Sequence, residues 1–178
     1  MHDRIVSTAF FDHRNCINKF PVPGICGRFR GHYTRPAGLS TVSAFQWPVR
    51  VYYEDTDSGG VVYYANYLRF MERARTEWMR ALGFEQDQLT EEQGVLFAVR
   101  SAHIEYLRTA HFNDLLCVSA AIIDQGRASL TFSQEIRRCD DDSGPVCTGE
   151  IKIACLDAET LRPRAIPDFI LKEIADVE

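Results

Sequence analysis

The stretch that decides the fold covers residues 49–83 and reads VRVYYEDTDSGGVVYYANYLRFMERARTEWMRALG. Its first residues, Val49 to Tyr53, are β-branched or aromatic at alternate positions, which is the pattern of a strand. The polar turn Asp55 to Gly60 follows, and its paired glycines permit positive φ angles. A helix is then predicted over 64–82. The pattern therefore places a carboxylate-rich loop between a strand and the start of a long helix.

Apolar residues recur at three- and four-residue steps along this helix, which indicates that one helix face packs in a core. The predicted core face consists of Ala65, Leu68, Met71, Trp78 and Leu82. Charged residues lie between them and could form either a solvated, salt-bridged surface or part of an interface. This predicted surface consists of Glu72, Arg73, Arg75 and Glu77.

The remaining chain changes from helical to strand-like patterns. A short helix is predicted over 85–93, with Gly94 closing it, and a last helix over 167–177. Strands are predicted over 44–53, 95–106, 114–123, 128–137 and 146–156. This order contains no βαβ repeat, so an α+β domain with an antiparallel sheet wrapped around one central helix is the economical solution.

Composition limits the possible classes of protein. With 178 residues, 46% of them hydrophobic, the chain is expected to form one domain over 44–178, preceded by an irregular extension over 1–43. No run approaches the roughly 18 apolar residues of a membrane span, and the first residues do not resemble a secretory signal. These features predict a cytoplasmic protein.

Charge and cysteine spacing exclude further classes. Residues 1–44 carry a net charge of +4, which leaves −9 for 45–178 and argues against nucleic acid as a main partner. The six cysteines form no CxxC pair and no Cys/His cluster, so we expect reduced, packed thiols instead of disulfides or zinc ligands. These cysteines are Cys16, Cys26, Cys117, Cys139, Cys147 and Cys155.

Three segments carry a resemblance to a known family: WPVRVYYEDTD at 47–57, GVVYYANY at 60–67 and ERARTE at 72–77. They resemble the hot-dog-fold acyl-CoA thioesterases, and more narrowly the Tol-Pal system-associated (YbgC-like) group of the 4-hydroxybenzoyl-CoA thioesterase superfamily. The resemblance covers 45–172. It implies a five-stranded antiparallel sheet around the long helix, a dimer or tetramer, and active sites at the subunit interface.

The same resemblance implies the activity. The protein would hydrolyse acyl-CoA to a free acid and coenzyme A, without a metal or a separate cofactor, because coenzyme A is part of the substrate. Acyl carrier protein is a further candidate partner.

Site residues are carried over by matching positions. A thioesterase needs a nucleophile or base at the carbonyl carbon and donors for the developing oxyanion. The resemblance assigns the first role to Asp57, as nucleophile or general base. It places the oxyanion at backbone N–H groups of Val62, Tyr63 and Tyr64. Many members of the narrower group have histidine at the position of Tyr64, so this tyrosine is expected to orient or contact the substrate.

Two further residues and several alternatives complete the predictions. Arg127 and Ser129 are expected to meet the nucleotide end of coenzyme A. His103 and His111 are expected to be structural. The two aspartates of the DTD segment could instead be turn residues. A hot-dog hydratase would need a histidine near the helix, and none lies between His32 and His103. A non-catalytic protein that binds acyl carriers or an envelope-linked partner stays a second function class.

Overall fold

The structure is a computed structural model that describes residues 45–141 and 143–176. The predicted extension over 1–43 lies outside these residues. The elements are β1 (Phe45–Arg50), a 3-10 turn η1 (Tyr53–Asp55), α1 (Tyr64–Ala81), α2 (Gln86–Gln93), β2 (Val95–Tyr106), β3 (Leu115–Gln125), β4 (Ser129–Arg138), β5 (Cys147–Asp157) and α3 (Asp168–Ala175). None of the helices in the described part of the chain is both long and apolar enough to cross a membrane.

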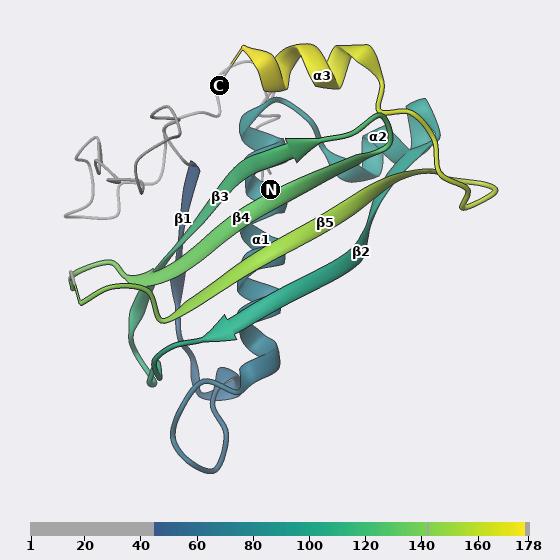
Figure 1. Cartoon of the computed structure of the whole chain (residues 1–178). Coiled ribbons are helices and arrows are strands. Elements are labelled where there is room, and N and C mark those ends of the chain that lie inside the picture. The colour runs from purple at the N-terminus through teal and green to yellow at the C-terminus, as the bar shows by residue number, and fades with distance from the viewer. Residues whose placement is uncertain (1–44, 142, 177–178) are drawn as a thin grey trace, which may run out of the picture.

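One antiparallel sheet forms the body of the domain. Its five strands lie in the order β1-β3-β4-β5-β2, so β1 and β2 are the two edges. Helix α1 lies along one face of this sheet, and α3 lies near the end of β3 (Figure 1). Sheet and helix bury a shared apolar core because each has one apolar face. The arrangement confirms the predicted α+β hot-dog architecture.

The first strand is shorter than predicted. It ends at Arg50, and the chain then turns through η1. The backbone N–H of Tyr52 donates to Oδ2 of Asp55 at 2.9 Å, so the aspartate closes this turn from within. The alternating pattern predicts a strand to residue 53, but the part-buried contact between Tyr52 and Asp55 turns the chain instead.

Helix α1 matches its predicted bounds, but its buried face is rotated from the predicted one. Met71 and Trp78 are buried as expected, whereas Leu68 is 38% exposed. Arg75, predicted to be on the charged surface, is buried. The helix packs through the residues Tyr67, Phe70, Met71, Ala74, Trp78 and Met79. The central face therefore includes one cation that helical periodicity alone had assigned to solvent.

The cysteine prediction was wrong for one pair. Cys117 on β3 and Cys139 just after β4 form a disulfide with their Cα atoms 5.2 Å apart. The antiparallel pairing of β3 with β4 brings them together, since Cys117 lies opposite Arg137 in the register. Cys147 and Cys155 are free and buried, as predicted. Burial raises the pKa of the Cys147 thiol to about 12.

Candidate active site

Asp57 lies in a tight, exposed loop between η1 and α1. Its N–H donates to the carbonyl of Val61 at 2.9 Å, and its own carbonyl accepts from the N–H of Gly60 at 3.0 Å. Its carboxylate Oδ1 accepts from the N–H of Gly59 at 2.8 Å. Gly60 has a φ of 74°, which explains the need for glycine there. The loop thus holds the carboxylate in a defined direction while leaving it open to solvent.

Asp55 has a different role from Asp57, although only one residue separates them. Its side chain is buried, with 5% of its surface exposed. Besides the contact with Tyr52, its backbone carbonyl accepts from Nδ2 of Asn66 at 3.0 Å and from the N–H of Tyr63 at 2.8 Å. Asp55 therefore anchors the loop to the first turn of α1, and Asp57 is the carboxylate that remains accessible.

The backbone donors at the start of α1 are fewer than predicted. The N–H of Val62 donates to the carbonyl of Ala110 at 2.8 Å, and the N–H of Tyr63 donates to the backbone carbonyl of Asp55 at 2.8 Å. Both are therefore unavailable for an oxyanion, and the prediction is revised at these two positions. Within the described part of the chain no hydrogen bond occupies the N–H of Tyr64, the first residue of the helix.

A group of tyrosines surrounds this helix start. The ring of Tyr64 lies 4.6 Å from that of Tyr63 and 6.2 Å from that of Tyr106 on β2, measured between centroids. A hydrogen bond with Tyr64 raises the pKa of Tyr63. Tyr67 is buried, and its hydroxyl accepts from the N–H of Ala110 at 3.2 Å. Burial is the main cause that raises the pKa of Tyr67. A phenol hydroxyl can both donate and accept a hydrogen bond.

His111 lies against the Asp57 loop, a placement that the sequence did not indicate. Its Nδ1 is 3.2 Å from the carbonyl of Gly60 and its Nε2 is 3.3 Å from Oγ1 of Thr109. Because a carbonyl can only accept, Nδ1 carries the proton in this contact. Residues 61 and 111 also form a β-bridge. His111 is thus structural, as predicted, and what it supports is the glycine turn beside Asp57.

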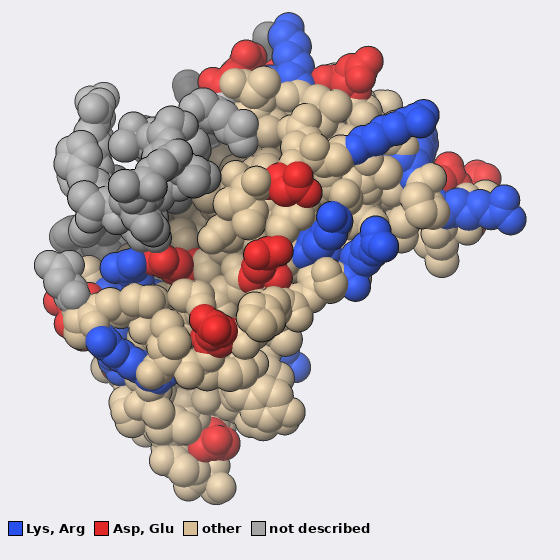
Figure 2. All heavy atoms as spheres, viewed as in Figure 1, with Lys and Arg blue, Asp and Glu red and all other residues tan. Residues whose placement is uncertain are grey.

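Arg127 lies in the β3–β4 turn and Ser129 is the first residue of β4, both far from Asp57 of the same subunit. The turn is stabilised by the N–H of Gly126, which donates to the carbonyl of Ser129 at 2.8 Å. β3 begins near the Asp57 loop and ends at this turn, so the length of the strand, roughly 34 Å, separates the two sites. Lys and Arg side chains gather at the end of the sheet where this turn lies (Figure 2). One subunit does not bring the predicted residues together.

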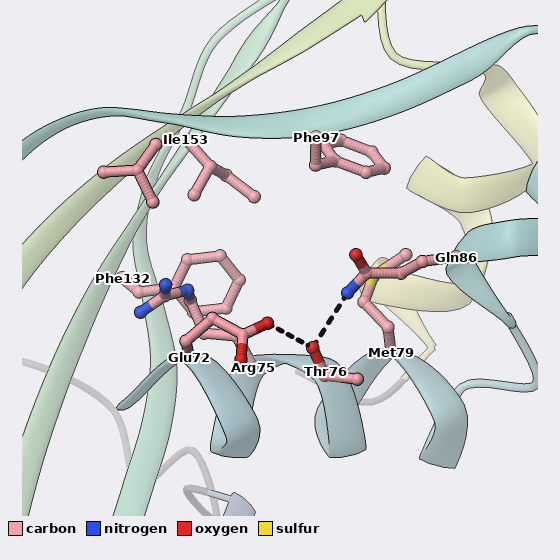
Figure 3. A pocket seen from close by; sticks show the side chains of 9 residues that line it. Glu72, Arg75, Thr76, Met79, Gln86, Phe97, Phe132 and Ile153 are labelled. Carbon is pink, nitrogen blue, oxygen red and sulfur yellow. Dashed lines mark hydrogen bonds between the residues drawn. The ribbon is translucent and has the colours of Figure 1, made fainter. Parts of the chain in front are cut away.

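A cavity lies between α1, α2 and the sheet. Its volume is about 70 Å³, and Figure 3 shows its walls. Phe97, Phe132 and Ile153 form the sheet side, while the polar groups come from the helices. Among the helix residues, Glu72 and Arg75 carry charge. The cavity therefore combines an apolar sheet side with a charged helix side.

Metal binding was not expected, and the described residues contain no cluster of three His, Cys, Asp or Glu side chains that could hold an ion. The site instead combines an accessible carboxylate, an unpaired N–H at a helix start and several phenol donors. A carboxylate can attack a carbonyl carbon or activate water, and the positive end of a helix stabilises negative charge. These groups fit acyl transfer to water.

Comparison with known proteins agrees with this chemistry. A family model described as "Thioesterase-like superfamily" matches residues 51–174. The chain is 43% identical over 125 residues to the acyl-CoA thioesterase YbgC of Haemophilus influenzae, covering 70% of this chain and 90% of that protein. It is 36% identical over 131 residues to the YbgC of Helicobacter pylori, covering 70% and 95%.

A solved structure shares the fold. A 1,4-dihydroxy-2-naphthoyl-CoA thioesterase from Synechocystis superposes with a TM-score of 0.69 at 20% identity, covering 75% of this chain and 97% of that one.

Proposed function

The chain belongs to the thioesterase-like superfamily and is an acyl-CoA thioester hydrolase, and we propose that Asp57 is the carboxylate that performs the hydrolysis. The observation that carries this proposal is the contrast within the DTD segment. Asp55 is buried and bonded, whereas Asp57 is exposed and accepts a hydrogen bond from the N–H of Gly59 in the loop that precedes the helix. The neighbouring N–H of Tyr64 supplies the oxyanion donor.

Two routes lead from this geometry to the same products. As a general base, Asp57 takes a proton from water, and the hydroxide adds to the thioester carbonyl. As a nucleophile, Asp57 forms a mixed anhydride that water then hydrolyses. In both, the carbonyl oxygen becomes negative facing the N–H of Tyr64, and the thiolate of coenzyme A leaves and takes a proton. One water is consumed, and an acid and a thiol are formed.

The proposed active unit is a dimer formed by edge strand β2. Of the two sheet edges, β1 is six residues long and contains Pro48, whereas β2 is twelve residues long. Its middle, residues 99–103, is exposed. A long unpaired edge favours pairing with another strand. Large apolar side chains are also exposed at this edge: Val99 and Tyr106 on the strand, and Tyr64, whose ring lies 6.2 Å from that of Tyr106.

A two-fold axis at the middle of β2 also brings the separated residues together. Pairing about Ser101 would place Phe97 opposite Glu105 of the partner subunit, because the strands run antiparallel. The β2 start of one subunit, with its basic sheet end (Figure 2), then approaches the partner's catalytic loop. Arg127 and Ser129 would bind the nucleotide phosphates across this interface. This arrangement explains why they lie far from Asp57 of their own subunit.

The second candidate is a non-catalytic protein that binds acyl carriers. The accessible carboxylate at the helix start favours the enzyme. The deciding experiment measures release of free thiol from short, long and aromatic acyl-CoAs, and from an acyl group on acyl carrier protein. Turnover that disappears in Asp57→Asn supports the enzyme. No turnover by a folded dimer on any thioester favours the binding protein.

A cytoplasmic location is part of the proposal and is tested by cell fractionation.

A further inference from the structure

We propose that the cavity beside α1 binds a carboxylate at the far end of a short acyl group, with Arg75 as its partner. This inference rests on the proposed thioesterase function and specifies its substrate class. The cavity is about 70 Å³ in volume. Because a single water molecule needs roughly 10–15 Å³ of cavity volume, the cavity has room for a short acyl chain and not for a long one.

Arg75 is a buried cation that forms no ion pair with the described residues, although the exposed Glu72 on the same cavity wall favours its charged form. Only 9% of the surface of Arg75 is exposed. Nη1 donates to Oε1 of Gln134 at 2.6 Å, which is a neutral group. Across residues 45–141 and 143–176, no carboxylate oxygen lies within 4.0 Å of a side-chain nitrogen of Arg75, which is the distance limit for an ion pair. Arginine is rarely buried unless it is paired, so a ligand is the natural source of the missing anion.

The support behind Arg75 is rigid. Gln134 is fully buried and uses its Nε2 to donate to the carbonyls of Met71 and Ser119, each at 3.1 Å. Its amide oxygen is thereby directed at the guanidinium. One nitrogen is fixed in this way, while the guanidinium keeps further N–H donors for a ligand. A planar, fixed guanidinium is suited to bidentate recognition of a carboxylate.

The other polar groups of the cavity satisfy one another. Nε2 of Gln86 donates to Oγ1 of Thr76 at 3.1 Å, and Thr76 donates to Glu72 at 2.8 Å (Figure 3). Glu72 is exposed, so water screens its charge. Burial lowers the pKa of Arg75 and the charge of Glu72 opposes this shift. Arg75 is therefore the donor in this wall that gains most from an added anion.

The thioester that reaches this cavity belongs to the partner subunit's catalytic loop. Within one subunit, Arg75 lies eleven residues after the start of α1, a rise of about 16 Å. A short acyl group on its own Asp57 could not span that length. Pairing of β2 about its middle brings Phe97, which lines the cavity, toward the partner's helix start. A short acyl chain with a terminal carboxylate then bridges the two subunits.

The test compares two thioesters of equal chain length, glutaryl-CoA and pentanoyl-CoA, which end in a carboxylate and a methyl group. Wild type should hydrolyse glutaryl-CoA with a kcat/KM at least about tenfold higher, because a site built for a hydrogen-bonding group rejects an analogue that lacks it. Arg75→Gln should lose this preference, and Arg75→Lys should recover part of it. The matched control is Arg73→Gln, an exposed arginine on the same helix outside the cavity, which should keep it.

A wild-type preference for pentanoyl-CoA, or equal use of both, would overturn the inference. If Arg75→Gln does not fold, calorimetry on wild type decides: glutarate should bind and pentanamide, which has the same chain length but no carboxylate, should not. Absence of glutarate binding contradicts the inference. Hydrolysis of neither thioester would contradict the proposed enzyme. Glutarate binding would then still support the cavity, so the two failures are distinguishable.

Discussion

Because Asp55 anchors the loop and Asp57 is the accessible carboxylate, we expect Asp55→Ala to lower the free energy of unfolding while a measurable kcat remains. The substitution removes the carboxylate that accepts from the N–H of Tyr52 at 2.9 Å inside a site that is only 5% exposed. A hydrogen bond to a charged group contributes about 1.5–3 kcal/mol, and this one is part-buried. We therefore expect the free energy of unfolding to fall by about 2 kcal/mol.

The assay is urea unfolding followed by tryptophan fluorescence, with Asp57→Ala as the matched variant. Asp57 is exposed, and its removal should change the free energy of unfolding by roughly 0.5 kcal/mol or less. Under conditions where Asp55→Ala is folded, it should retain a measurable kcat. Equal stability of the two variants, or a greater loss of stability for Asp57→Ala, would refute the assignment of Asp55 as the anchor.

Three other predictions follow from the same structure. His111→Ala removes the contact with the Gly60 carbonyl and should lower kcat about tenfold or more, whereas the exposed Arg73→Gln should leave kcat unchanged. Full activity of His111→Ala would contradict a positioning role. Reduction of the Cys117–Cys139 disulfide, which closes a loop with a sequence separation of 22, should lower the free energy of unfolding by about 3 kcal/mol, and urea curves that coincide with and without reductant would contradict this. Ser101→Lys places like charges opposite each other at the proposed two-fold and should raise the dimer dissociation constant up to about fivefold in light-scattering measurements; an unchanged constant argues against pairing through β2.

The helix and strand predictions succeeded where a local pattern is strong. The long helix has eighteen residues in the structure and begins at the predicted Tyr64. Gly94 ends α2 in the left-handed conformation, with a φ of 62°, as its position suggested. Such features depend on spacing along the chain, so the sequence alone indicates them.

Predictions failed where the decisive contact joins distant segments. The Arg75 side chain is buried because Gln134, 59 residues away, receives its N–H. The N–H of Val62 is unavailable because the carbonyl of Ala110 accepts it. The disulfide depends on the register of β3 against β4, which no spacing of Cys117 and Cys139 reveals. Each case needs the tertiary pairing before the side chain can be placed.

The candidate site was predicted only in part for a related reason. The family resemblance assigned Asp57, whose loop geometry the structure then describes, but its catalytic role stays a proposal. The support from His111 was not predicted, because the contact joins a glycine turn to a segment some fifty residues later. The proposed cross-subunit role of Arg127 was inferred from strand lengths, which become useful only once the strand order is known.

The measurement that tests the account most directly is the kcat of Asp57→Asn for thiol release from an acyl-CoA that wild type hydrolyses. The substitution removes the carboxylate charge at nearly constant volume, so melting temperature and oligomeric mass should match those of wild type. Loss of a positioned base or nucleophile should lower kcat about 10³-fold. A folded, dimeric Asp57→Asn with kcat close to wild type would contradict the claim that Asp57 performs the hydrolysis.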